Sequence, residues 1–293
     1  MQLNWTEIES ALKVVRQRVR PTPAYSWPQM KVRTGVDIVV KHENHTPTGS
    51  FKARGGLVFV DALHKRGATE GLVTATRGNH GQSIAMGASS VGIKSLIVVP
   101  QGNSIEKNAA MKAFGGALLE AGADFDEARR VAAKESASRN WVFVPSFHRD
   151  IVRGVSTYAL ELFTEVSGID TVFVPIGMGR GICGLIAIRD LLGLKAKIGG
   201  VVADQAPAFA LSYQQGTVRT ASAATFADGL ACREPQPEVL EIILKGAADV
   251  VRVTDQEIAD AIREIYDTTH NLADGAGAAA SAAAVNHRGQ YPG

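Results

Sequence analysis

The stretch Ser95-Leu96-Ile97-Val98-Val99-Pro100 decides the fold class, because four consecutive apolar residues stand just before a proline. A strand with one face in water alternates apolar and polar residues, whereas a strand covered on both faces is apolar throughout. The stretch Thr171-Val172-Phe173-Val174 repeats the pattern further along the chain. Sheets covered on both faces are mostly parallel, and parallel strands need long, usually helical, connections. These stretches therefore predict parallel β-sheets covered by helices.

Strand-like and helix-like stretches alternate along most of the chain. Short β-branched runs predict strands over residues 37–43, 71–76, 95–100, 118–122, 141–146, 171–176, 198–204 and 250–254. Intervening stretches such as 104–116 and 150–168 place apolar residues on one face of a helix, and residues 276–284 predict an Ala-rich, tightly packed helix. The alternation predicts the α/β class. Because no shift in composition separates two consecutive domains, we expect any second domain to be reached by several crossings of the chain.

Composition limits the classes of function. Of the 293 residues, 45% are hydrophobic and 20% are charged, proportions typical of a globular rather than a disordered protein. The formal net charge of +2 is too small to indicate binding to nucleic acid or to an anionic membrane. We find no apolar run long enough to cross a membrane and no signal-peptide pattern. Cys183 and Cys232 have no metal or redox spacing, so the cytoplasm is the expected compartment.

Polar loops follow three of the predicted strands, where ligands bind in α/β folds. The first loop, residues 44–56, contains Thr48-Gly49-Ser50-Phe51-Lys52. Thr48 and Ser50 are typical of helix starts, so Lys52 is expected in the first turn of a helix. The positive end of the helix dipole disfavours an ammonium there, and a buried lysine that loses its proton can attack a carbonyl. For Lys52 taken alone, an ordinary surface lysine is the alternative.

The second and third loops indicate anion sites. Residues 76–82 read Thr-Arg-Gly-Asn-His-Gly-Gln, and a helix that begins at Asn79 would offer backbone N–H groups to a carboxylate. Residues 177–184 read Gly-Met-Gly-Arg-Gly-Ile-Cys-Gly, a glycine-rich turn of the kind that binds phosphate. Gly179, Gly181 and Gly184, with Asp204 after the next strand, equally fit a dinucleotide site. From this loop alone, an NAD-dependent dehydrogenase and a binding-only protein stay open.

Together the three loops resemble a known family. Ser50-Phe51-Lys52-Ala53-Arg54-Gly55-Gly56, preceded by Lys41-x-Glu43 and Thr48-Gly49, resembles the cofactor-attachment segment of the pyridoxal-phosphate-dependent serine/threonine dehydratases. Gly78-Asn79-His80-Gly81-Gln82 resembles the substrate-carboxylate loop of that family, and residues 177–184 resemble its phosphate-binding loop. Residues 226–229 and 271–277 match two later segments in the same order. The chain is thereby identified as similar to the threonine ammonia-lyases of this family.

The resemblance implies a fold and a division into domains. The fold is the tryptophan-synthase-β-like α/β fold, which is fold type II of the pyridoxal-phosphate enzymes, with two parallel-sheet domains and the cofactor in the cleft. A large domain would contain residues 1–73 and 148–293, and a small domain would contain residues 74–147. The family also implies a homodimer.

The resemblance assigns roles to residues as well. Lys52 would hold pyridoxal 5'-phosphate as a Schiff base and then remove the α-proton of the substrate. Phe51 would pack on the pyridine ring, Asn79 would bind the ring hydroxyl, and Gly229 would lie near the ring edge. The residues expected around the phosphate are Gly177, Met178, Gly179, Arg180 and Gly181. The residues expected around the substrate are Ser50, Thr76, Arg77, Gly78, Asn79 and His80.

The implied reaction converts a β-hydroxy amino acid, L-threonine or L-serine, to a 2-oxo acid and ammonia, with serine racemisation as an alternative. Arg77 departs from the small residue that is usual in the dehydratases. A guanidinium is a poor acid, which disfavours racemisation, but it binds carboxylates in a bidentate manner. Arg77 therefore predicts either an acidic substrate, such as 3-hydroxyaspartate, or an ion pair with a nearby acid. Arg180 either adds charge at the phosphate or points outward.

Metal ligands and the C-terminal end complete the expectations. His42 and His45 flank Glu43 without a third ligand, and Ala210 stands where racemase-like members carry a second acid after Asp204, so no metal is expected. The resemblance implies a further strand and a Ser/Cys-Gly-Gly turn beyond Gly293, which would meet the pyridine nitrogen. If the 293 residues are the whole chain, we expect weak retention of the cofactor.

Overall fold

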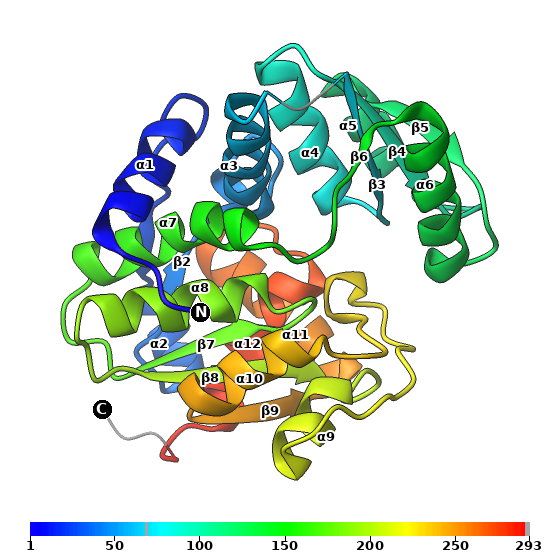
Figure 1. Ribbon diagram of the computed structural model, residues 1–293. Helices are drawn as coiled ribbons and strands as arrows, with labels where there is room; N and C mark the ends of the chain where they lie inside the picture. Colours follow the sequence, from blue (N-terminus) through cyan, green and yellow to red (C-terminus); the bar gives the residue numbers. More distant parts are fainter. Residues whose placement is uncertain (68–69, 291–293) are drawn as a thin grey trace. The chain divides into compact units, whose positions relative to one another are not determined.

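The computed structural model describes residues 1–67 and 70–290 (Figure 1). The chain divides into two compact units, neither of which is continuous in sequence. Unit 1 contains residues 1–4, 22–42 and 158–293, and unit 2 contains residues 5–21 and 43–157. The expectation of several crossings between domains is thus confirmed.

Unit 2 is built around a parallel sheet with the strand order β5-β4-β3-β6. The strands of this sheet are β3 (Gly71–Ala75), β4 (Lys94–Val99), β5 (Ala117–Glu120) and β6 (Val142–Phe143). The helices of unit 2 are α1 (Trp5–Val15), the short 3₁₀ helix η1 (Glu43–His45), α3 (Lys52–Lys65), α4 (Asn79–Ser90), α5 (Ile105–Ala113), α6 (Phe125–Arg139) and the first half of α7 (Arg149–Glu165).

The small domain expected over residues 74–147 lies within unit 2. Its expected first boundary falls inside β3, which begins at Gly71. Unit 2 also takes in α1 and α3, because these helices pack on each other and α3 packs on α4. The boundaries of the two domains stay a prediction.

The position of strand β4 between two layers of helices explains why its sequence is apolar at consecutive positions. Leu96 and Val98 belong to a hydrophobic cluster with α6, whereas Ile97 and Val99 belong to another with α4 and α5. Successive side chains of a strand point to opposite faces of the sheet. Helices therefore cover both faces, as the sequence predicts for a parallel sheet.

Unit 1 contains a parallel sheet with the order β7-β8-β9 and an antiparallel pair, β1-β2. The strands of unit 1 are β1 (Ala24–Ser26), β2 (Val39–Lys41), β7 (Thr171–Pro175), β8 (Lys197–Ala203) and β9 (Asp249–Val253). Its helices, besides the second half of α7, are α2 (Pro28–Thr34), α8 (Arg180–Leu191), α9 (Ala208–Gln215), the 3₁₀ helix η2 (Asp228–Leu230), α10 (Pro237–Gly246), α11 (Asp255–Thr269) and α12 (Gly275–Asn286).

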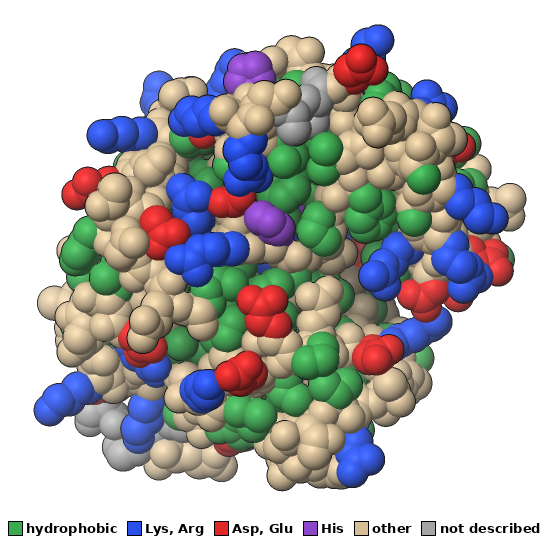
Figure 2. Space-filling model, viewed as in Figure 1, with side chains coloured by type: hydrophobic (Ala, Val, Ile, Leu, Met, Phe, Trp, Pro, Cys, Tyr) green, Lys and Arg blue, Asp and Glu red, His purple; other side chains and the backbone are tan. Residues whose placement is uncertain are grey.

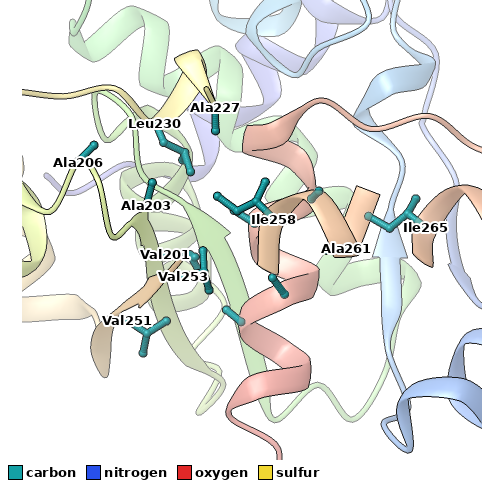
Figure 3. Packing of buried hydrophobic residues seen from close by; sticks show 14 of the residues in the cluster. Val201, Ala203, Ala206, Ala227, Leu230, Val251, Val253, Ile258, Ala261 and Ile265 are labelled. Carbon is teal, nitrogen blue, oxygen red and sulfur yellow. The ribbon is translucent and has the colours of Figure 1, made fainter. Parts of the chain in front are cut away.

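The core of unit 1 joins its sheet to α11 and α12. Figure 3 shows Val201 of β8 and Val253 of β9 pointing toward Ile258 of α11. Helix α12 packs against all three strands of the sheet. Its buried face consists of alanines and a serine, and such small side chains let a helix lie close to a sheet. The Ala-rich helix expected over residues 276–284 is confirmed.

The predicted strands are all present, and the parallel pairing is confirmed for seven of the eight. The exception is the strand expected over residues 37–43. It is β2, which pairs antiparallel with β1. The sequence pattern missed β1 because this strand has only three residues, of which Tyr25 and Ser26 are exposed.

Surface charge agrees with the composition. Figure 2 shows Lys and Arg side chains among Asp and Glu side chains over the visible face, in keeping with the net charge of +2. In the described ranges, no helix is long and apolar enough to cross a membrane. Cys183 and Cys232 are buried free thiols, and burial raises the pKa of Cys183 to about 12 and that of Cys232 to about 11.

Ile97 provides a test of the two-faced sheet in unit 2. We expect Ile97→Ala to lower the free energy of unfolding by about 2–5 kcal/mol, because the fully buried side chain leaves a cavity. Ile105→Ala removes the same atoms from a side chain that is 82% exposed, and should change this free energy by less than about 0.5 kcal/mol. Urea unfolding measures both values. Equal losses for the two variants would contradict the placement of β4 between two layers of helices.

Candidate active site

Lys52 is the first residue of α3, as the preceding residues predict. The loop before it is closed by Thr46, whose Oγ1 accepts a hydrogen bond from Ser50 N–H (2.9 Å) and donates one to Ser50 C=O (2.8 Å). Gly49 has a φ of +65°, in the left-handed region that favours glycine. Ser50 Oγ accepts a hydrogen bond of 3.4 Å from Lys52 N–H, and Lys52 Nζ lies 4.9 Å from the centre of the Phe51 ring. These contacts hold the backbone from which the Lys52 side chain extends.

Helices α3 and α4 pack closely and run in parallel (Figure 1). A Cβ atom on Gly56 of α3 would come within 2.3 Å of the Ser83 carbonyl oxygen of α4. One turn further along α4, a Cβ on Gly87 would come 2.8 Å from the Gly56 carbonyl oxygen and 3.0 Å from the side chain of Val60, which lies one turn further along α3. The contacts advance together along both helices, so the helices point in the same direction. Since Gly56 and Ser83 lie equally far from the starts of their helices, Lys52 and Asn79 lie at the same end of the pair.

The loop between β3 and α4 carries most of the predicted substrate residues. Thr76 Oγ1 accepts hydrogen bonds from the backbone N–H groups of Gly78 (3.0 Å) and Gly81 (3.4 Å). Helix α4 begins at Asn79, as predicted, and the next residue, His80, is buried. The loop is therefore held in place by its own threonine at the N-terminal end of a helix, a position that favours anions.

Two basic residues belong to this loop or touch it. Arg77 is exposed, and within residues 1–67 and 70–290 it forms no ion pair, so the expected alternative of an ion pair with a nearby acid is not observed. Lys107 of α5 lies against Gly78, where an added Cβ would come 2.6 Å from Lys107 Cδ and 3.3 Å from its Cε. Sequence reasoning missed Lys107 because it lies on another helix, with no local pattern that links it to the loop.

In unit 1, the predicted glycines form a narrow cradle. A Cβ on Gly177 would come 2.1 Å from the carbonyl oxygen of Gly229, and a Cβ on Gly229 would come 2.7 Å from Cβ of Ala276. Gly179 has a φ of +82° and precedes the first residue of α8. The structure thus brings both later segments of the resemblance beside the predicted phosphate loop. We call Gly177, Gly179 and Gly229 the glycine cradle.

The other residues of the phosphate loop lie at the start of α8. Arg180 is the first residue of this helix and its side chain is buried, which excludes the alternative that it points outward. Burial lowers the pKa of the Arg180 guanidinium to about 10, so the group stays charged at neutral pH. Met178 is half-buried, and the buried Gly181 accepts a hydrogen bond of 3.3 Å from Tyr158 through its carbonyl oxygen. A helix N-terminus and a buried cation together favour an anion.

The residues considered above for a metal or a dinucleotide contact other side chains of the protein. His42 Nε2 accepts a hydrogen bond of 3.1 Å from the indole N–H of Trp27. Glu43 accepts two hydrogen bonds from Arg54, a pair that sequence reasoning quoted without assigning it a role. Asp204 lies 3.7 Å from the Arg252 guanidinium. Over the part of the chain that the structure describes, no group of three such side chains could hold a metal ion.

Comparison with known proteins identifies the family. Residues 15–293 match the family described as pyridoxal-phosphate dependent enzymes, and the chain belongs to this family. The chain is 34% identical to an L-threonine ammonia-lyase of Geobacter sulfurreducens over 289 residues, which are 98% of this chain and 72% of that protein. It is 31% identical to a biosynthetic L-threonine dehydratase of Pasteurella multocida over 259 residues, which are 88% of this chain and 50% of that protein.

A solved structure shows the same fold. The processed form of threonine deaminase isoform 2 from Solanum lycopersicum has a TM-score of 0.88 and 27% identity, covering 97% of this chain and 85% of that chain. The expected α/β fold of type II and the expected cofactor, pyridoxal phosphate, are thereby confirmed at the level of the family. The dinucleotide interpretation of the Gly179 loop does not agree with this family. The chain spans about half the length of the biosynthetic dehydratases that it matches.

Gly177 provides a test of the glycine cradle. We expect Gly177→Ala to weaken the binding of pyridoxal phosphate by about tenfold or more, because the added methyl displaces Gly229 and costs on the order of 1.4 kcal/mol or more. Gly246→Ala is the matched control, since its added Cβ crowds Ile186 at 2.4 Å without touching the cradle. Titration of the cofactor by absorbance measures both affinities. Equal weakening in the two variants would show a general loss of stability in place of a local role.

Proposed function

We propose that this chain catalyses the conversion of L-threonine or L-serine to a 2-oxo acid and ammonia with pyridoxal 5'-phosphate. The observation that carries the proposal is the place of Lys52 at the first position of α3, at the same end of the helix pair as Asn79. The relatives named as L-threonine ammonia-lyases and dehydratases support the same reaction. An amino acid is accordingly the substrate that we assign.

Within each unit, the residues present suit the part of the cofactor that the resemblance assigns to them. Lys52 offers an amine to its aldehyde, and the glycine cradle at the start of α8 offers a compact loop in which any Cβ on Gly177 would fill the space. The buried Arg180 adds a positive charge for the phosphate. We assign the phosphate to Gly177, Met178, Gly179, Arg180 and Gly181. We assign the pyridine ring to Phe51, Asn79 and Gly229.

The roles of the protein groups follow from their chemistry. When bound, pyridoxal phosphate supplies a conjugated ring system that accepts the electron pair left by removal of the α-proton. Lys52 would hold the cofactor through its side-chain amine, and the same amine, when free, would accept the α-proton of the substrate. The loop from Thr76 to His80 binds the substrate carboxylate at the start of α4. Loss of the β-hydroxyl as water, followed by hydrolysis of the C–N bond, converts L-threonine to 2-oxobutanoate and ammonia.

Arg77 favours a second candidate, a β-hydroxy amino acid with an additional carboxylate such as 3-hydroxyaspartate. Its guanidinium is exposed and pairs with no acid in the described ranges, and Lys107 lies against the neighbouring Gly78. An exposed guanidinium in the predicted carboxylate loop suits a dianionic substrate. The same residue argues against racemisation, because a guanidinium stays protonated at neutral pH and is a poor proton donor.

The proposal extends to the state of the protein in the cell. We infer a homodimer from the family resemblance. We infer a cytoplasmic location from the two buried, reduced cysteines and from the amino-acid chemistry of the family.

Lys52→Ala tests the proposed reaction. We expect the visible band of the bound cofactor to disappear and turnover of L-threonine to fall at least about 100-fold, because both the covalent anchor and the base are removed. Lys65→Ala is the matched control, since Lys65 is the exposed last residue of the same helix. Absorbance spectroscopy, borohydride reduction and mass spectrometry of the Lys52 peptide measure the result. If the unmutated protein stays colourless after pyridoxal phosphate is added, the proposal is wrong.

Arg77→Ala tests the acidic substrate. If Arg77 binds a second carboxylate, kcat/KM for 3-hydroxyaspartate should fall about 10- to 100-fold, the range of a lost charge-assisted hydrogen bond, while that for L-threonine changes less than about twofold. Arg129→Ala, at an exposed position of α6, is the control. Steady-state assays of 2-oxo acid formation give both values. An unmutated enzyme that turns over L-threonine but not 3-hydroxyaspartate would rule out the acidic substrate alone.

A further inference from the structure

Arg54 stands out among the charged residues of unit 2. It lies two residues after Lys52 in the first turn of α3, and its side chain is completely buried. Its Nε and Nη2 donate to the two carboxylate oxygens of Glu43 at 2.8 and 2.9 Å, and its Nη1 donates to Thr157 Oγ1 at 3.2 Å. A buried guanidinium needs such compensation, and the bidentate form fixes the geometry of both partners. We call this pair the Glu43–Arg54 clamp.

The clamp joins the two ends of the segment that leads into Lys52. Glu43 begins η1, so the pair joins residues 43 and 54 at the two ends of the loop. Inside it, the two hydrogen bonds of Thr46 with Ser50 close a second, smaller ring, and Thr48 Oγ1 adds a bond of 3.3 Å to Ser50 C=O. Two nested closures therefore hold the stretch immediately before Lys52.

Packing around the clamp leaves little freedom to the start of α3. On α7, a Cβ on Gly154 would come 2.3 Å from the Arg54 carbonyl oxygen. On α4, the Ser83 carbonyl lies equally close to the place where a Cβ on Gly56 would stand. The backbone next to Lys52 is thus held by α7, by α4 and by the clamp. Reaction rates depend strongly on such positioning, because a reacting group must be placed to within a fraction of an ångström.

We propose that the Glu43–Arg54 clamp is a positioning device for Lys52, which sets the place of its amine for attack on a carbonyl carbon. This inference rests on the proposed function, in which Lys52 joins the cofactor aldehyde by forming an imine bond with loss of water. Arg54 and Glu43 touch neither substrate nor cofactor in this role. They act on the reaction through the backbone of the loop and of the first turn of α3.

Replacing both members of the clamp separates its effect on the stability of the protein from its effect on the position of Lys52. Arg54→Met or Glu43→Leu alone leaves one buried charge without its partner and should lower the melting temperature. The double variant Arg54→Met/Glu43→Leu replaces the pair by apolar groups of similar volume, which commonly restores stability. It does not restore the bidentate geometry. We therefore expect a melting temperature near that of the unmutated protein together with a rate of imine formation at least tenfold slower.

The measurement uses the full chain freed of cofactor. Pyridoxal phosphate is added in a stopped-flow spectrometer, the absorbance gives the rate of imine formation, and borohydride with mass spectrometry confirms attachment to Lys52. The control Arg33→Met/Glu264→Leu removes an ion pair of 2.8 Å in unit 1, away from the predicted site residues, and should leave the rate within twofold. With L-threonine, the clamp variant should show a lower kcat and a KM within twofold of that of the unmutated protein.

The outcomes distinguish the two proposals. A double variant that regains both stability and rate overturns the positioning role and leaves the clamp a structural ion pair. If the double variant does not fold, the variant Arg54→Lys is measured in its place. It keeps the positive charge but cannot form the bidentate contact with Glu43. An unchanged rate of imine formation in this variant overturns the inference. If the unmutated protein gives no adduct on Lys52, the proposed function fails and the inference fails with it.

Discussion

The close contact between α3 and α4 is the constraint on which the candidate site depends. Glycines at positions 56 and 87 leave out the side chains that would hold the two backbones apart. Because the helices run in parallel, their N-terminal ends lie together, and each end carries the partial positive charge of its helix dipole. Lys52 and the loop from Thr76 to His80 therefore lie at the same end of the helix pair as a consequence of one packing contact. A larger residue at Gly56 would disturb both features at once.

Close backbone contact also shapes the glycine cradle of unit 1. The carbonyl oxygen of Gly229 occupies the space that a side chain on Gly177 would need, and Gly229 in turn lies against α12. Segments from three distant parts of the sequence thus meet at the start of α8. In both units, the candidate sites depend on glycines near helix starts, because a backbone without side chains lets neighbouring segments approach closely.

A buried arginine lies at each of the two candidate sites. The carboxylate of Glu43 neutralises Arg54, so the pair fixes the positions of its two segments and adds no net charge. Arg180 carries its charge into the first turn of α8, where burial lowers its pKa without discharging it at neutral pH. The first arrangement suits a device that positions a lysine. The second suits the binding of a phosphate.

The sequence by itself determined the fold class, the positions of the predicted strands and the place of Lys52 and Asn79 at helix starts. These features follow from local patterns: apolar runs in strands such as β4, and polar residues before helices. The short strand β1, the burial of Arg180, the contact of Lys107 with Gly78 and the Glu43–Arg54 clamp were decided only by the tertiary structure. Each depends on which side chains and segments pack together in space, and burial and pairing of this kind leave no period or spacing in the chain.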